Sequence, residues 1–148
     1  MDNVKVMADS LNEKFGGKIG VSEDEKSLIV PAEEIIPVLK ELKESTDFSF
    51  LEDITAVDYP DNFTVVYHLM SLTDAKILRV KSLLEKENPH IDSLVSLWSS
   101  ANVMERETYD LLGVVFDGHP DLKRILCPDD FDGHPLRKDF KVETAPRQ

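Results

Sequence analysis

Two copies of the pentapeptide Phe-Asp-Gly-His-Pro, at residues 116–120 and 131–135, bring histidines and aspartates close together in the sequence. His119 and His134, with the aspartate two residues before each, are side-chain types that bind zinc and other divalent metals. Each histidine precedes a proline, which biases its backbone to an extended conformation and does not make ligands converge. Gly-His-Pro is also common turn sequence, since Gly allows a positive φ and Pro fixes φ. The repeat therefore favours two similar turns, with a metal site as the alternative.

A second group that could do chemistry is the set of carboxylates Glu105, Glu107 and Asp110, with Tyr109 beside them in the sequence. Paired carboxylates can act as general acid and base. Glu105 and Glu107 are two residues apart, however, and side chains at i and i+2 do not face each other on a helix. The spacing favours a solvated or partner-docking face over acid–base catalysis.

The chain has one cysteine, Cys127, which follows Leu126 and precedes Pro128. Neither a neighbouring base nor a helix N-terminus is in view to activate it, so we expect a packed or partly exposed thiol and not a nucleophile. A single cysteine allows no internal disulfide and no cysteine-rich metal or iron–sulfur site within the chain. This usage suits a reducing compartment.

The composition is that of an ordinary globular protein, with 148 residues, 41% hydrophobic and 31% charged. The formal net charge of -12 argues against nucleic-acid binding and against an anionic membrane surface, because both need clustered Lys and Arg. No run approaches the roughly 20 apolar residues of a membrane helix. The N-terminus lacks an unbroken apolar stretch, so we expect no signal peptide.

The elements that must position these residues follow from the apolar periodicity, which predicts one α+β domain over residues 1–113. We expect two layers: a mixed or mainly antiparallel sheet of about five strands, with helices on one face. The expected elements are helices at 3–15 and 31–45, short strands at 18–21 and 28–30, a hairpin at 50–59 and 63–71, a strand at 76–85, and a helix at 102–112.

Three positions carry specific expectations for the helices. Pro37 lacks the amide proton of the helical ladder, so the second helix either starts later or bends there. Asn102 and Glu105 have the spacing of a capping box at the start of the last helix. Gly113 suits the left-handed residue that follows a helix.

From residue 114 to residue 148 the chain is rich in Pro, Gly, Asp and His, with an apolar residue every few positions. We expect an extended but ordered C-terminal arm, part of the same structural unit, which owes its order to a surface it lies against. Arginines and carboxylates on such a loop suit bidentate pairing across an interface. The predicted partner-docking residues are Glu105, Arg106, Asp110, His119, Asp121, Arg124, Arg137, Lys138 and Asp139.

The run ANVMERETYDLLGVVFDGHPDLKRILCPDDFDGHPLRKDF, residues 101–140, strongly resembles the signature of the 30-kDa-type subunit of respiratory complex I, the proton-pumping NADH:quinone oxidoreductase. Its earlier pieces are Glu105-Arg106-Glu107, Tyr109-Asp110, Gly113 and Gly118-His119-Pro120-Asp121-Leu122. Its later pieces are Arg124-Ile125-Leu126 and Gly133-His134-Pro135-Leu136-Arg137-Lys138-Asp139-Phe140. The preceding part of the chain resembles the family in its order of elements.

The resemblance implies a scaffold subunit that has no cofactor and no active site of its own. It implies an arm that docks on the hydrogenase-like large subunit, near the quinone end of the electron path, close to the iron–sulfur small subunit. Such a chain would be peripheral on the cytoplasmic face of the cell membrane and held there only through the complex. The alternatives are the equivalent subunit of an energy-converting nickel–iron hydrogenase or ferredoxin-fed complex, and a free-standing metal-dependent hydrolase that uses His119 and His134.

Overall fold

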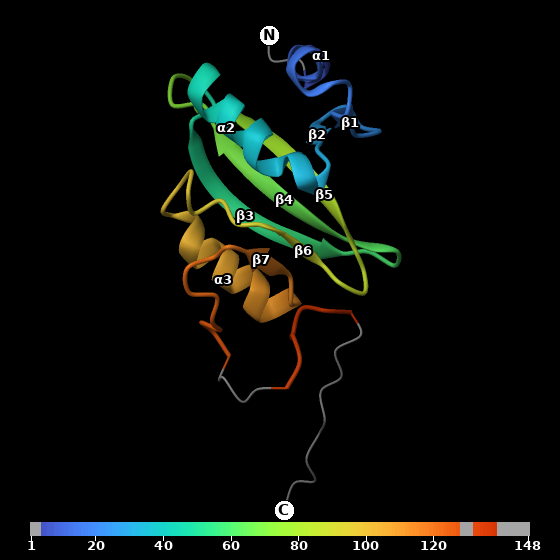
Figure 1. Cartoon of the computed structure of the whole chain (residues 1–148), viewed down its shortest axis with the longest axis vertical. Helices are drawn as coiled ribbons and strands as arrows, with labels where there is room; N and C mark the ends of the chain where they lie inside the picture. The colour runs from blue at the N-terminus through green and yellow to red at the C-terminus, as the bar shows by residue number, and fades with distance from the viewer. Residues whose placement is uncertain (1–3, 128–131, 139–148) are drawn as a thin grey trace, which may run out of the picture.

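The centre of the fold is a long strand hairpin, and the computed structural model describes residues 4–127 and 132–138 around it (Figure 1). The helices are α1 (Val4–Phe15), α2 (Ile35–Ser45) and α3 (Ala101–Leu112), with a short 3-10 turn η1 (Ala32–Glu34) before α2. The strands are β1 (Gly20–Val21), β2 (Ser27–Ile29), β3 (Phe50–Asp58), β4 (Asn62–Met70), β5 (Ile77–Glu85), β6 (His90–Asp92) and β7 (Val115–Asp117).

Five of the strands form one mixed sheet in the order β1-β2-β5-β4-β3. β2 and β5 run parallel, and the other neighbouring pairs are antiparallel. A register shift between Leu51 and Asp53 bends the outer strand β3. The predicted α+β class, the mixed sheet and the strand number are therefore confirmed.

The two faces of this sheet differ, because strand side chains alternate between them. On β4 the side chains of Phe63, Val65, Tyr67 and Leu69 are almost fully buried. They join the core with α2, which lies across that face of the sheet (Figure 1). On β5 the opposite face carries side chains such as Leu83, which is 51% exposed.

The helix starts differ in detail from the sequence expectation. α2 begins at Ile35, after η1, so Pro37 falls in the first helical turn, where a missing amide proton breaks no ladder bond. α3 begins at Ala101, and Ser100 precedes it without a side-chain cap. The predicted capping box is wrong, because Glu105 is turned into the core.

A short parallel pair, β6 with β7, was not predicted. It ties residues 90–92 to the first residues of the expected arm, and Phe116 on β7 is 1% exposed. Three-residue strands are too short to show a period, which is why residues 114–117 carry no strand signal in the sequence. The pair brings the end of α3 and the start of the arm into the domain's core.

Candidate interaction site: the arm folded on helix α3

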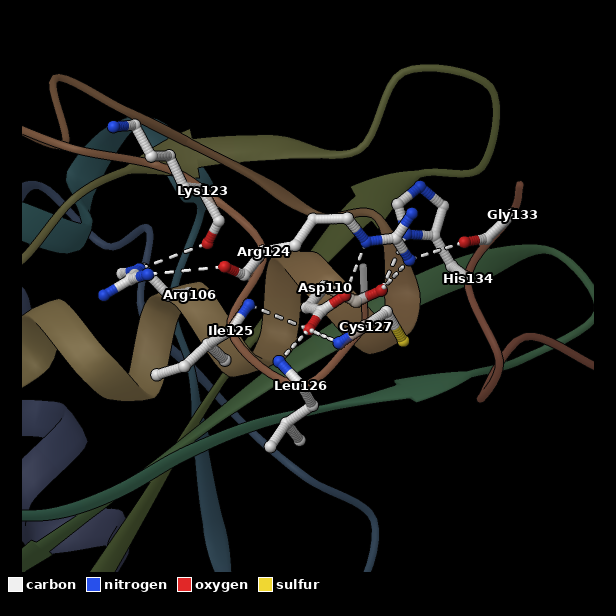
Figure 2. A network of polar contacts seen from close by, with 9 residues as sticks. All are labelled: Arg106, Asp110, Lys123, Arg124, Ile125, Leu126, Cys127, Gly133 and His134. Carbon is white, nitrogen blue, oxygen red and sulfur yellow. Dashed lines mark hydrogen bonds and ion pairs between the residues drawn. The ribbon is translucent and has the colours of Figure 1, made fainter. Parts of the chain in front are cut away.

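Asp110 on α3 is the centre of a polar network that holds the arm (Figure 2). Its side chain is fully buried. The Oδ2 atom accepts backbone N–H groups from Ile125, Leu126 and Cys127, at 3.0, 2.6 and 2.9 Å. Three consecutive amides that converge on one carboxylate oxygen fix the backbone of this turn.

Arg124, one residue before the turn, supplies the opposite charge. Its Nε donates to Asp110 Oδ1 at 2.6 Å, and its Nη2 donates to the carbonyls of Asp110 and Gly133 at 2.9 and 2.6 Å. Burial by itself would raise the pKa of Asp110, but Arg124 and the three amides outweigh it and hold that pKa far below its usual value. The Asp110–Arg124 pair is thus a buried, fully ionised link between helix and arm.

Arg106, one helical turn before Asp110, holds the same segment of the arm through main-chain oxygens. Its Nε donates to the carbonyl of Lys123 at 3.1 Å, and its Nη2 donates to the carbonyl of Arg124 at 3.3 Å. Side chains at i and i+4 lie side by side on a helix, so Arg106 and Asp110 hold adjacent parts of one loop.

A second group of contacts caps the C-terminus of α3. The last carbonyls of a helix have no partner within it and need one from elsewhere. Here the arm supplies them in order: His134 Nδ1 donates to Asp110 O at 2.9 Å, Leu136 N–H donates to Leu111 O at 2.8 Å, and Arg137 Nε donates to Leu112 O at 2.6 Å.

Gly113 makes this capping possible. It is left-handed, with φ of 78°, as predicted for the residue after a helix. A Cβ at this position would lie 2.5 Å from Nη2 of Arg137 and 2.7 Å from the nearest ring atom of His134. Glycine is therefore required twice, by the backbone conformation and by the approach of two side chains from the arm.

A third contact lies at the end of β3, next to the turn that joins β3 to β4. Asp58, 5% exposed, accepts the backbone N–H of Lys138 at 2.8 Å and forms an ion pair with Lys86. Lys86 and Arg137 both lie over the ring of Phe63, at 4.4 and 5.1 Å from its centroid. The arm is thus attached at residues 123–127, 134–137 and 138.

Glu105 holds a different segment. Its carboxylate is fully buried, accepting the Ser93 hydroxyl at 2.6 Å and the Leu94 N–H at 2.7 Å. Burial raises its pKa, and the two hydrogen bonds offset only part of this effect. The side chain fixes the loop after β6 and does not reach the surface.

The two histidines of the repeated pentapeptide serve the backbone. His119 donates from Nε2 to the carbonyl of Asn102 at 3.0 Å and accepts the N–H of Asp121 at Nδ1, 2.9 Å away. Gly118 and Gly133, which precede the histidines, have φ of 80° and 95°, as two similar turns require. Within residues 4–127 and 132–138 no three His, Cys, Asp or Glu side chains gather into a possible metal site.

The predicted docking residues therefore divide by position. Glu105 and Asp110 are buried, so the expectation that they touch a partner directly is revised, because their carboxylates bind the chain's own amides and hydroxyls. Asp121 and Lys138 are exposed, and Asp139 lies outside the described residues. Arg106, His119, Arg124 and Arg137 are partly buried, with their donors on main-chain oxygens or on Asp110.

Sequence reasoning missed Asp58, Phe63 and Ser93 as members of these networks. Asp58 contacts Lys138, which is 80 positions later in the sequence, and no local sequence pattern predicts a contact between residues so far apart in the chain. Sequence reasoning also attributed the order of the arm to a partner surface. In the structure, α3 of the same chain holds the described part of the arm. An acidic residue on the inward-facing side of a predicted strand was the signal available for Asp58.

Comparison with known proteins agrees with the resemblance of the C-terminal motif. Residues 28–146 match the family described as the respiratory-chain NADH dehydrogenase 30 Kd subunit. The C subunit of NADH-quinone oxidoreductase from Moorella thermoacetica is 54% identical over 123 residues, covering 82% of this chain and 83% of that protein. Its counterpart from Citrifermentans bemidjiense is 46% identical over 127 residues, covering 84% and 79%.

Two solved structures have the same fold. A trypsin-resistant fragment of Nqo5 has a TM-score of 0.65 and 33% identity, covering 78% of this chain and 98% of that one. A chain of the membrane-bound sulfane sulfur reductase, an archaeal respiratory membrane complex, has a TM-score of 0.78 and 25% identity, covering 95% and 87%. None of the helices in the described residues has the length and apolarity to cross a membrane. The chain belongs to the 30-kDa subunit family of respiratory-chain NADH dehydrogenase, found in complex I-type oxidoreductases.

Proposed function

We propose that this chain is a non-catalytic scaffold in the peripheral arm of a membrane-bound, ion-translocating NADH:quinone oxidoreductase. In this proposal the C-terminal arm docks on the hydrogenase-like large subunit, near the quinone end of the electron path and close to the iron–sulfur small subunit. The chain sits on the cytoplasmic face of the membrane through these partners. Family membership supports a place in a complex of this type.

The observation that carries the non-catalytic role is how the reactive-looking side chains are used. Asp110 and Arg124 neutralise each other, Glu105 binds a buried loop, and His119 uses both ring nitrogens on the backbone. A general acid or base must reach a substrate proton within hydrogen-bond distance. These groups already have partners within the chain, which supports a role in holding the fold of the arm and not a role in catalysis.

That shape suits docking. An arm that is folded before it meets a partner loses less conformational entropy on binding than a disordered one. Three separate attachments hold the described arm to α3 and to the end of β3. The arm is consequently a prepared surface for another subunit.

A second candidate is the equivalent subunit of a related membrane-bound complex with another electron donor or acceptor, such as an energy-converting hydrogenase. The structural similarity to a chain of the sulfane sulfur reductase complex, which covers 95% of this chain, supports this second candidate. Both candidates share the docking role and differ in the other subunits of the complex.

The test is purification of the full chain, affinity-tagged at its N-terminus, from detergent-solubilised membranes of its own cells. We expect the hydrogenase-like large subunit and the iron–sulfur small subunit in yields similar to the tagged chain. Flavin-containing NADH-binding subunits in the same preparation select the respiratory complex, and a nickel-containing large subunit selects the hydrogenase. Recovery of the chain alone, or only from the soluble fraction, would contradict the proposal.

A further inference from the structure

The turn at Ile125 and Leu126 combines a fixed backbone with exposed aliphatic side chains. Ile125 is 37% exposed and Leu126 is 62% exposed. Their amides are bound to the buried carboxylate of Asp110, and Figure 2 shows their side chains pointing away from it. The chain thus keeps most of the Leu126 side chain and part of the Ile125 side chain in water at a defined place.

Such an arrangement is unfavourable for the isolated chain. The exposed parts of Ile125 and Leu126 forgo a share of the roughly 1.5–3 kcal/mol that full burial of each side chain would give. Burying an ion pair also has a large desolvation cost, which only good geometry and extra hydrogen bonds offset. The network defines the backbone of the turn and leaves much of these two side chains outside the fold.

The charges next to this turn indicate the chemistry of the partner surface that it fits. Asp110 and Arg124 form an internal pair, with Arg124 Nε 2.6 Å from Asp110 Oδ1. Lys123, the next charge along the chain, has its Nζ 3.3 Å from Asp121 Oδ1. The charges of residues 121–124 are therefore balanced within the described chain, and Arg106 beside them uses its donors on the carbonyls of Lys123 and Arg124. An apolar recess complements such a turn better than a basic or acidic patch does.

Resting on the proposed function, we propose that Ile125 and Leu126 insert into an apolar recess of the hydrogenase-like large subunit, and that Asp110 is the positioning residue that aims them. Small groups of buried apolar anchors supply most of the affinity of typical interfaces. Anchors whose backbone is already fixed need little ordering on binding. Asp110 acts only through the turn and touches no partner.

The first test removes the anchors and leaves the network intact. The double variant Ile125→Ser/Leu126→Ser keeps the amides that bind Asp110, so we expect an unchanged circular dichroism spectrum and only a small fall in melting temperature, because Ile125 is partly packed. The yield of large subunit per tagged chain should fall by about tenfold or more. The matched control is Val6→Ser/Leu72→Ser, since those residues are 63% and 68% exposed and belong to α1 and to the loop between β4 and β5. Both segments lie at the opposite end of the molecule from the arm (Figure 1). This control should co-purify the large subunit as the wild type does.

The second test separates positioning from general stability. Asp110→Asn keeps the side-chain shape and removes the charge. At a temperature well below its melting point, it should weaken co-purification by about as much as loss of the anchors does. Combined with Ile125→Ser/Leu126→Ser, it should add little, because both changes remove one interaction. A residue with only a structural role would give additive losses.

The outcomes are distinct. Wild-type yield from the Ile125→Ser/Leu126→Ser variant overturns the inference and leaves the proposed function standing. Additive losses overturn the positioning role of Asp110. A wild-type chain that elutes as a dimer on size exclusion and becomes monomeric in the double variant assigns the turn to a second copy of this chain, and also overturns the inference. A wild-type chain that never co-purifies the large subunit overturns the proposed function itself.

Discussion

Asp58 and Lys138 are 80 positions apart in the chain, yet the backbone N–H of Lys138 lies 2.8 Å from the carboxylate of Asp58. The bond joins the end of β3 to the last described residue of the arm. Because the donor is a backbone amide, the identity of the side chain at position 138 is left available for another purpose. Arg137, the preceding residue, uses its side chain internally, on Leu112 O and over the ring of Phe63.

This contrast gives a prediction for two neighbouring charge reversals. Arg137→Glu places a carboxylate against the Leu112 carbonyl and the face of Phe63, so it should release residues 134–137 of the arm from the end of α3. Lys138→Glu leaves every described bond of the arm in place, and should change only the surface charge. We expect Arg137→Glu to speed deuterium exchange of the Leu136 amide at least tenfold and Lys138→Glu to leave it unchanged.

Co-purification then reports whether the charge of Lys138 itself contributes to docking. If the large subunit is lost with Lys138→Glu while exchange at Leu136 is normal, Lys138 contacts the partner directly. Equal exchange rates for Arg137→Glu and the wild type would contradict the capping role of Arg137.

Gly113 gives a second prediction, with a control in the same chain. Gly113→Ala strains a left-handed backbone and pushes against Arg137 and His134, whereas Gly118→Ala, at φ of 80°, meets no atom within 4 Å. We expect Gly118→Ala to lower the free energy of unfolding by about 1 kcal/mol, from backbone strain alone. Gly113→Ala should lower it by roughly 2–4 kcal/mol, because the crowding adds to the strain. Urea denaturation measures both, and equal losses would argue against the close packing.

The Asp110–Arg124 pair predicts a stability change in acid. The folded-state pKa of Asp110 is well below its ordinary value of 3.8, so its contribution is full above pH 3.8. The contribution is lost progressively as pH falls from there through the folded-state pKa. Asp110→Asn should lower the free energy of unfolding at pH 7 by about 3 kcal/mol, because it removes one charge of a buried pair.

Urea midpoints measured from neutral pH down into acid, below the ordinary aspartate pKa of 3.8, check this. The loss of stability on acidification should be smaller in Asp110→Asn than in the wild type. The same acid dependence in both chains would mean that Asp110 is not ionised inside the fold.

Glu105 predicts the opposite direction. Its folded-state pKa is raised above the ordinary 4.5, so the folded chain holds the proton more tightly than the unfolded chain. This contribution favours folding at low pH and is lost as pH rises from 4.5 through the raised value. Glu105→Gln can still accept the Leu94 amide and can donate to the Ser93 hydroxyl. It should be more stable than the wild type at pH 8, because the neutral amide avoids the cost of burying a charge.

Thermal unfolding at pH 8 and at pH 4 provides the measurement, with Glu107→Gln as the exposed control on the same helix. The stability difference between Glu105→Gln and the wild type should shrink toward pH 4. A variant less stable than the wild type at pH 8 would show that the ionised carboxylate is worth more to the fold than its burial costs.

The fold followed from the sequence where long periodic segments decide it. The alternation of β5 and the apolar stripe of α2 each repeat over several turns or residue pairs, so they predict both the element and its buried face. The parallel pair β6–β7 has three residues in each strand and no such pattern. Its pairing depends on where α3 returns the chain, which is a tertiary property.

The site was predictable in its residues and not in their partners. The density of Arg, Asp and His after residue 104 indicates a network, and the i, i+4 spacing places Arg106 and Asp110 together. Whether a carboxylate meets another chain or the amides of Ile125 and Leu126 depends on a loop conformation that spacing does not encode. Glu105 shows the same limit: its spacing fits a cap, but the buried Ser93 and Leu94 bind it.

The most direct test of the central claim is amide deuterium exchange of the arm, measured on the isolated chain and on the solubilised complex. The claim is that α3 holds the arm ready and that a partner then covers it. The amides of residues 125–127 should already be protected in the isolated chain, and residues 121–126 should become more protected in the complex. Exchange at the unprotected rate in the isolated chain, or an arm whose exchange is the same with and without the complex, would contradict it.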